Sequence, residues 1–152
     1  MTDWLLAPPR GRDDRAWLAL RIALWPEGSE ADHLEGMADM LARGHCVRLA
    51  VTATGVAVGL VEAAKRVDYV NGTTTSPVAF LEGLYVVPEW RRRGVARTLV
   101  ESVVDWALQH DLSELASDSL IDNVAAHSAH RALGFEETER VVYFRRPLRP
   151  RR

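Results

Sequence analysis

Four arginines surround a single glycine in residues 87–97, and they are the side chains best suited to binding an anion. They are Arg91, Arg92, Arg93 and Arg97, with Gly94 among them. An apolar strand pattern precedes this segment and an amphipathic helix pattern follows it. A helix start binds anions through its unpaired N–H groups and the helix dipole, and arginine adds charge for phosphate groups. We therefore predict a phosphate-binding loop; a basic turn before an ordinary surface helix is the alternative.

Two carboxylates belong to predicted strands, one inside a strand and one at the end of the next. Glu82 interrupts an otherwise apolar stretch, residues 78–87, where a carboxylate is costly to bury unless it is paired, hydrated or functional. Asp118 ends the next strand pattern, and it would come near the end of the strand that contains Glu82 if the two strands are neighbours that splay apart. The alternatives are a structural salt bridge for Glu82 and a turn cap at Asp118 and Ser119.

The elements that must position these residues begin with two helices. Asp13 or Asp14 can cap a helix that ends near residues 25–26, and Ser29 can cap a second helix that Gly44 stops. We expect a short first strand at residues 4–7. Residues 46–53 and 56–64 predict a β-hairpin.

The second half alternates between strands and helices. Residues 65–77 are rich in turn formers and predict a long loop of the kind that covers a site. A strand at 78–87, a helix that ends near His110, a strand at 112–117, a helix at about 122–133 and a last strand at 141–145 follow. The order β-α-α-β-β-β-α-β-α-β predicts an α/β protein with a mixed sheet and helices on both faces.

Composition and charge suggest one domain over residues 1–152 that binds cations. The chain is 47% hydrophobic and 26% charged, within the range of globular proteins. Five of the 19 basic residues lie in the last eight, so 14 bases face 21 acids in the rest. Such a body favours cationic partners over nucleic acid. We expect residues 146–152 to be a disordered basic tail; contact of this tail with RNA or a membrane is the alternative.

Several features predict a cytoplasmic protein. No stretch approaches the roughly 18 continuous apolar residues of a membrane span, and the N-terminus lacks the layout of a signal peptide. Cys46 is the only cysteine and lies in an apolar run. We expect a buried thiol there rather than a nucleophile.

The arginine–glycine loop resembles the acetyl-CoA signature of the GNAT superfamily of N-acetyltransferases, Arg/Gln-Xaa-Xaa-Gly-Xaa-Gly/Ala. Residues 123–126 and 132–135 resemble the second half of the family pattern. The resemblance implies a GNAT fold with a central, mainly antiparallel twisted sheet, and acetyl-CoA as co-substrate without a metal. The cofactor-binding positions that it implies are Leu84, Tyr85, Val86, Arg91, Arg92, Arg93, Gly94, Val95, Ala96, Arg97, Asn123 and His130.

Three of these roles are specific. The resemblance implies that the thioester arm pairs with the backbone of residues 84–86 and that Asn123 hydrogen-bonds the arm; a helix cap is the alternative for Asn123. His130 stands where many GNAT enzymes have a tyrosine that hydrogen-bonds the departing thiol. A histidine can donate a proton near neutrality, and helix packing or capping is the alternative for His130.

Several stretches resemble a narrower group, the dimeric aminoglycoside 6′-N-acetyltransferases of the enterobacterial and Acinetobacter type. They are residues 24–26, 68–72, 76–78, 80–83, 93–96, 116–118 and 132–141. The first dozen residues and the segment after Arg145 match poorly. The resemblance implies a homodimer and an aminoglycoside partner. The drug-binding positions that it implies are Trp25, Tyr69, Glu82, Asp118 and Glu139.

The chemistry of such a drug agrees with these positions. A polycation with hydroxyl-rich rings calls for several carboxylates and for aromatic faces. As isolated residues, Trp25 as core and Tyr69 as a loop anchor are the alternatives. For the acidic cluster of Glu136, Glu137 and Glu139, the alternative is a solvated face.

The expected mechanism is direct transfer in a ternary complex. An amine attacks a thioester only as the neutral base. We predict that Glu82 or Asp118, directly or through water, orients the 6′-ammonium and accepts its proton, and that a backbone N–H of residues 84–86 stabilises the oxyanion. Two alternatives are an enzyme for a polyamine, a protein N-terminus or another small amine, and a non-catalytic protein that binds acetyl-CoA or a drug.

Overall fold

The computed structural model describes residues 3–152, which form two compact units. The first reaches to Asp118 and contains all the strands with helices α1, α2 and α3, and the second runs from Ser119 to Arg152 with helix α4. No helix within residues 3–152 is long and apolar enough to cross a membrane.

The first two helices begin at the predicted caps. Helix α1 (Arg15–Leu24) starts at Asp14, whose Oδ1 accepts hydrogen bonds from the N–H groups of Ala16 and Trp17 at 2.9 and 3.2 Å. Helix α2 (Glu30–Ala42) starts at Ser29, which forms a capping box with Asp32. These side chains satisfy backbone N–H groups that the first helical turn leaves unpaired. Both predicted helices are confirmed.

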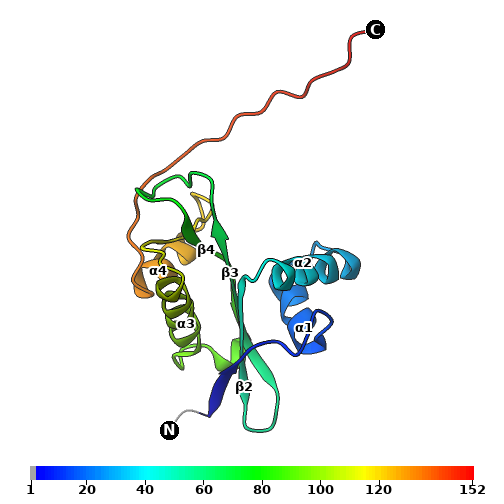
Figure 1. Cartoon of the computed structure of the whole chain (residues 1–152), viewed down its shortest axis with the longest axis vertical. Helices are drawn as coiled ribbons and strands as arrows, with labels where there is room; N and C mark the ends of the chain where they lie inside the picture. The colour runs from blue at the N-terminus through cyan, green and yellow to red at the C-terminus, as the bar shows by residue number, and fades with distance from the viewer. Residues whose placement is uncertain (1–2) are drawn as a thin grey trace. The chain divides into compact units, whose positions relative to one another are not determined.

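The sheet is mixed and mainly antiparallel, as predicted (Figure 1). Its strands are β1 (Trp4–Ala7), β2 (Cys46–Thr52), β3 (Ala57–Arg66), β4 (Val78–Val86) and β5 (Leu115–Ala116), in that spatial order. The first four pair antiparallel to their neighbours, and β5 pairs parallel to β4. The predicted strand at 112–117 is therefore present in shortened form.

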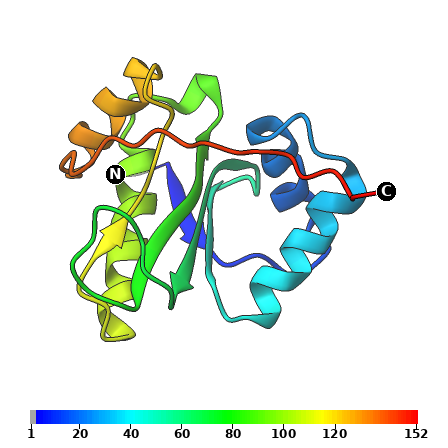
Figure 2. The same cartoon turned by 90° about the horizontal axis from the view of Figure 1, so that it is seen from above.

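Helices cover both faces of this sheet. Helices α1 and α2 lie on one face and α3 (Val95–Gln109) lies on the other (Figure 1 and Figure 2). Helix α3 approaches β3 closely because Gly59 has no side chain: a Cβ there would lie 2.9 Å from Val95 Cγ1. The core on the α1 side is a cluster of buried residues, Trp17, Leu18, Leu20, Met37, Met40, Val47, Leu49 and Leu60.

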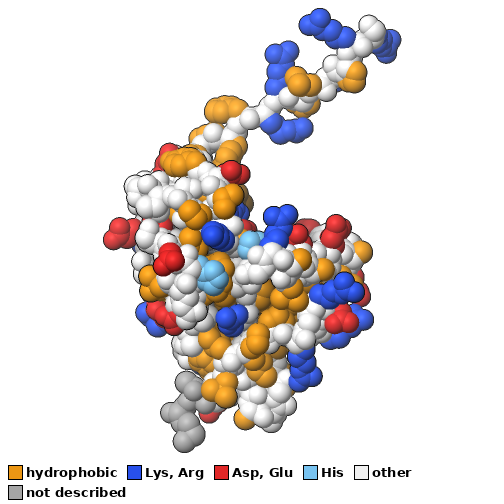
Figure 3. Space-filling view, viewed as in Figure 1, with side chains coloured by type: hydrophobic (Ala, Val, Ile, Leu, Met, Phe, Trp, Pro, Cys, Tyr) orange, Lys and Arg blue, Asp and Glu red, His pale blue; other side chains and the backbone are white. Residues whose placement is uncertain are grey.

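The second unit contains α4 (Val124–Ala132), and Gly134 follows it with a φ of 93°. Residues 135–152 form neither helix nor strand, so the predicted last strand at 141–145 is wrong. Its apolar residues are exposed, with Phe144 at 92%, and hydrophobic and arginine side chains follow one another along the segment (Figure 3). The physical reason is that a strand needs a partner to satisfy its backbone groups, and no described strand pairs with this segment.

Candidate active site

Strands β4 and β5 stop pairing just before the two candidate carboxylates. Their last parallel pair joins Phe80 and Ala116. Glu82 and Asp118 each follow this pair by two residues, so they occupy equivalent positions on the two segments beyond it. The predicted neighbourhood of the two strands is confirmed. Beyond Phe80, no strand of the described chain pairs with β4 on its β5 side, so backbone groups of residues 81–86 face away from the sheet there.

A β-bulge lies at Glu82. The adjacent β3 residues Glu62 and Ala63 face Gly83 and Leu81, so Glu82 is the extra residue on β4. A bulge interrupts the ladder and redirects a side chain, and bulges are frequent beside active sites. The Glu82 side chain is 31% exposed, whereas most other residues of β4 are buried.

An arginine holds the Glu82 carboxylate. Arg66 is the last residue of β3, and its Nε and Nη2 donate to Glu82 Oε1 at 3.1 and 2.9 Å, while Nη2 also donates to Oε2 at 3.0 Å. The Arg66 guanidinium lies 3.6 Å from the centroid of the Phe80 ring. The salt bridge considered as an alternative role for Glu82 is therefore present, and it lies at the surface rather than in the core.

Trp25 lies against the strand that carries Glu82. A Cβ at Gly83 would lie 2.6 Å from Trp25 Cη2, so the absence of a side chain at Gly83 lets the ring rest on β4. The guanidinium of Arg21 lies 5.0 Å from the Trp25 ring centroid, and His33 Nε2 donates to the Trp25 carbonyl oxygen at 3.0 Å. The half-buried ring thus lies against Gly83 and the Arg21 guanidinium, and His33 holds its backbone, one residue along β4 from Glu82.

A buried carboxylate supports Arg21 in turn. Glu62 on β3 is 1% exposed, and its Oε1 accepts hydrogen bonds from Arg21 Nη1 at 2.5 Å and from Trp17 Nε1 at 2.7 Å. Burial raises the pKa of Glu62, and the Arg21 charge and the Trp17 hydrogen bond oppose this shift. The pair joins α1 to β3 beneath Trp25.

The loop of residues 67–77 carries Tyr69, a residue that is 71% exposed. Internal bonds shape this loop: Thr73 Oγ1 donates to the Val70 carbonyl at 2.7 Å and Ser76 Oγ donates to the Val67 carbonyl at 2.9 Å. Tyr69 therefore projects to solvent instead of anchoring its loop, and its drug-binding role stays a prediction.

Glu114, the residue that precedes β5, binds this loop. Its Oε1 accepts hydrogen bonds from the N–H groups of Thr74 and Thr75 at 2.9 and 2.7 Å and from the Thr75 hydroxyl at 2.5 Å. The Thr75 side chain and the Thr74 backbone hold the pKa of Glu114 below its ordinary value. One carboxylate thus sets the position of the base of the Tyr69 loop.

The arginine–glycine loop has the geometry of an anion site. A short 3₁₀ helix, η1 (Pro88–Trp90), leads from β4 into the loop, and Gly94 begins α3 with a φ of 84°, which favours glycine. No side chain caps the start of α3, and a Cβ on Gly94 would find no atom within 4 Å. The first N–H groups of α3 therefore lack a side-chain cap, and the Gly94 position leaves room beside the helix start, which suits the phosphates of acetyl-CoA.

The arginines of this loop are exposed and differ in their contacts. Arg91 Nε donates to the Val86 carbonyl at 2.9 Å, and its guanidinium lies 5.7 Å from the Tyr85 ring centroid. The Arg93 guanidinium lies 4.8 Å from the Trp90 ring centroid. Arg91 thus already contacts the strand on which the thioester arm was predicted to lie. The cofactor-binding roles stay predictions.

In the second unit, Asn123 and His130 hold helix α4 and its end. Asn123 Oδ1 accepts a hydrogen bond from the Ala126 N–H at 3.1 Å, so Asn123 is the helix cap considered as the alternative. His130 Nδ1 donates to the Ala126 carbonyl at 2.6 Å, and its ring meets Phe135 edge-on at 5.3 Å between centroids. With Nδ1 as the donor, a neutral His130 has Nε2 as an acceptor, so it could protonate a thiolate only as the imidazolium.

The acidic cluster after α4 is exposed. Glu137 pairs with Arg140 and with Arg131, and the Arg140 hydrogen bond holds the pKa of Glu137 below its ordinary value. Glu139, the predicted drug-binding member, is exposed. The solvated-face alternative describes the cluster within this unit.

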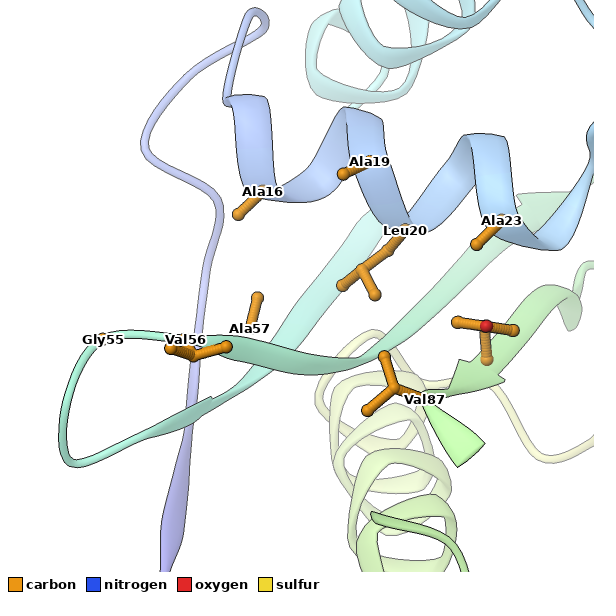
Figure 4. Close-up of a pocket in the computed structure, with 9 residues that line it drawn as sticks. Ala16, Ala19, Leu20, Ala23, Gly55, Val56, Ala57 and Val87 are labelled. Atoms are coloured by element: carbon orange, nitrogen blue, oxygen red, sulfur yellow. The ribbon is translucent and has the colours of Figure 1, made fainter. Parts of the chain in front are cut away.

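An apolar groove of about 440 Å³ lies between α1 and the strands (Figure 4). Ala16, Ala19 and Ala23 of α1 point toward it, and Ala57 and Val87 line the opposite wall. Tyr85 is the predicted site residue that it includes. Its lining offers few polar groups, so the groove is not the polycation site.

The sequence did not reveal three polar residues that the structure brings to the site. Arg66 and Glu114 hold Glu82 and the Tyr69 loop, and Glu62 holds Arg21. The sequence did contain an indication for Glu62, because Glu62, like Glu82, is a lone carboxylate in an apolar strand. Arg66 and Glu114 had none, because their partners lie 16 and about 40 residues away.

The described part of the chain offers neither a metal site nor a reactive cysteine. Residues 3–152 contain no group of three His, Cys, Asp or Glu side chains that could hold a metal ion. Cys46 is buried, and burial raises the pKa of its thiol, which disfavours the nucleophilic thiolate.

Comparisons with known proteins identify relatives that match most of the chain. Residues 15–135 match the model of the acetyltransferase (GNAT) family. An aminoglycoside N(6′)-acetyltransferase type 1 from Stenotrophomonas maltophilia is 52% identical over 91% of this chain and 90% of the relative. The crystal structure of an aminoglycoside 6′-N-acetyltransferase from Acinetobacter baumannii, 46% identical, covers 95% of this chain and 99% of its own, with a TM-score of 0.89.

A third relative was solved with a ligand that combines both substrates. It is AAC(6′)-Iy in complex with the bisubstrate analogue CoA-S-monomethyl-acetylneamine, 38% identical, with a TM-score of 0.89 over 97% of this chain and 100% of its own. Two features of the structure are consistent with these matches. The pairing of β4 with β5 ends after Phe80, and the start of α3 has no side-chain cap. The chain belongs to the GNAT family of acetyltransferases and, within it, to the family of the aminoglycoside 6′-N-acetyltransferases.

Proposed function

We propose that this enzyme transfers the acetyl group of acetyl-CoA to the 6′-amino group of aminoglycoside antibiotics and thereby confers resistance to them. The observation that carries this function is the equivalent placement of Glu82 and Asp118 just beyond the last β4–β5 pair, with Trp25 packed one residue from Glu82. Two carboxylates and an aromatic face suit a polycationic sugar. Relatives about 50% identical carry the same activity in their names.

The residues divide the work as follows. The first N–H groups of α3 and the arginines of residues 91–97 hold the phosphates, and acetyl-CoA supplies the acetyl thioester. The amide edge of residues 84–86, which lacks a strand partner on the β5 side, orients the acetyl group and stabilises the oxyanion. Glu82 binds the 6′-ammonium, because both of its oxygens already accept hydrogen bonds from a cation. Asp118, which is exposed, accepts the proton directly or through water.

The remaining predicted residues bind the other rings of the drug. Tyr69 projects from a loop that Glu114 fastens, and Glu139 contributes a further carboxylate. Asn123, whose Oδ1 caps α4, hydrogen-bonds the cofactor arm through its side-chain N–H group, and His130 protonates the departing thiolate from its imidazolium form. The protein acts as a homodimer in the cytoplasm. The exposed apolar residues 141–144 support self-association, and the single buried thiol is compatible with a reducing compartment.

The deciding experiment measures release of the CoA thiol with kanamycin as acceptor. Turnover is expected with kanamycin and not with an aminoglycoside that carries a 6′-hydroxyl in place of the amine, and mass spectrometry should show one added acetyl group. Turnover only with a polyamine or a peptide N-terminus would contradict the proposal, as would tight drug binding without thiol release.

The roles of the two carboxylates make a separate prediction. Asp118→Asn should lower kcat by about 10²- to 10⁴-fold, because it removes the proton acceptor. Glu82→Gln should mainly raise the KM for the drug. If both variants keep near-normal kcat, proton transfer belongs to another group; the KM for acetyl-CoA is the control for an intact fold.

A further inference from the structure

Arg66 forms an ion pair with Glu82, the carboxylate that binds the substrate amine in the proposed function. Both Glu82 oxygens accept hydrogen bonds from its guanidinium, at 2.9 to 3.1 Å. A substrate ammonium needs the same oxygens, because a cationic N–H donor binds a carboxylate through them. Arg66 and the substrate therefore compete for one site.

The strand register explains why Arg66 reaches Glu82. Arg66 faces Val78 across the β3–β4 ladder, and Phe80 is the diagonal neighbour that a long side chain can cover. The guanidinium lies on the Phe80 ring and extends to Glu82 at the bulge, two residues further along β4. The ring contact steers the arginine along the strand, and the bulge turns the carboxylate toward it.

The ion pair is of a kind that a ligand can open. The Arg66 and Glu82 side chains keep 42% and 31% of their exposure. Ion pairs exposed to solvent contribute little to stability, because water and salt screen them. The Arg66 guanidinium can therefore leave for solvent when a second cation arrives.

We propose that Arg66 is a specificity-determining residue that a substrate ammonium must displace from Glu82. A polycation, drawn by several carboxylates at once, supplies the attraction for this exchange, and an amine with a single charge does not. Arg66 thus favours polycationic acceptors over small monoamines. This inference rests on the proposed function, in which Glu82 binds the drug.

The test compares Arg66→Gln with wild type in the kanamycin thiol-release assay. We expect the KM for kanamycin to fall by about fivefold, the equivalent of one exposed ion pair, with kcat and the KM for acetyl-CoA unchanged. Arg66→Lys, which keeps the charge but not the two-pronged contact, should lower the KM by less. Arg43→Gln is the matched control, because it removes the same charge from an exposed pair at the C-terminal end of α2.

A double-mutant cycle with Glu82→Gln isolates the contact. In that background Arg66→Gln should leave the KM unchanged, since no carboxylate remains to be uncovered. A higher or unchanged KM for both Arg66 variants would overturn the inference, and a higher one would mean that Arg66 positions Glu82 for the drug. A failure of the proposed function would give a different result in this assay, because the wild-type enzyme would then release no thiol with kanamycin.

Discussion

At the scale of single residues, Glu62 and Glu82 show how two carboxylates in apolar strands acquire opposite roles. Glu62 is 1% exposed and accepts hydrogen bonds from Arg21 and Trp17 in the core. Glu82 lies on a bulge and forms an ion pair with Arg66 at the surface. Removing one partner of a buried ion pair leaves the other charge without compensation, so such pairs are costly to break. An exposed pair can open and close.

Glu62→Ala should therefore destabilise the protein strongly. We expect the free energy of unfolding, measured by urea denaturation, to fall by about 3–5 kcal/mol, because Arg21 and Trp17 lose their acceptor. Glu62→Gln keeps an acceptor oxygen and should cost less. Asp39→Asn, in the exposed pair with Arg43, is the control and should change the free energy by less than about 1 kcal/mol. Equal effects at the two sites would contradict this account.

At the scale of elements, the Tyr69 loop depends on one residue of another segment. Its bonds within the loop are local, and its attachment to the segment before β5 runs mainly through the Glu114 carboxylate, with a longer hydrogen bond of 3.5 Å from Ser113 Oγ to Thr75 Oγ1. Hydrogen bonds to the ionised form hold the pKa of Glu114 below its ordinary value, so the attachment is complete above that value. It weakens as the pH falls through the lowered pKa of the folded protein.

Glu114→Ala should release this loop without unfolding the sheet. We expect the amide protons of Thr74 and Thr75, which donate to Glu114, to lose their protection from hydrogen exchange. The KM for kanamycin should rise on the order of tenfold through misplacement of Tyr69, at constant KM for acetyl-CoA. Lowering the pH of the wild-type protein through the lowered pKa of Glu114, below the ordinary range of a glutamate, should reduce the same protection factors. Glu101→Ala on α3 serves as control, and unchanged protection in Glu114→Ala would remove Glu114 from this role.

At the scale of the whole molecule, the C-terminal segment has apolar side chains without a partner strand. Val142, Tyr143 and Phe144 are 74%, 81% and 92% exposed within the single chain. Contiguous exposed apolar residues mark interaction sites, and a segment with a strand pattern can pair with a second copy. This observation is the physical support for the proposed homodimer.

Light scattering should therefore give twice the 17.0 kDa of the chain. The double substitution Tyr143→Asp and Phe144→Asp should shift the protein toward monomers, because it puts charge on the surface that associates. Leu148→Asp, in the Arg-Pro tail beyond the strand pattern, should leave the mass unchanged. A monomeric wild-type protein, or a dimer that ignores the double substitution, would refute the dimer surface.

The sequence by itself determined the features that depend on local chemistry. Asp14 and Ser29 cap their helices because their oxygens meet N–H groups two or three residues on, and Gly94 starts α3 because its φ of 84° favours glycine. Alternating and helical apolar patterns gave the element order except for the strand at 141–145. The condition under which Asp118 would come near the strand of Glu82, that the two strands are neighbours, is met by the parallel pairing of β4 and β5.

Only the tertiary structure decided what each polar residue contacts. The bulge at Glu82 follows from the β3–β4 register, and no residue type in β4 predicts that register. The contacts of Arg66, Glu114 and Arg21 join residues up to about 40 positions apart, and long side chains can reach any of several neighbours. The strand predicted at 141–145 did not form because a strand exists through its partner's hydrogen bonds, whereas a helix carries its own.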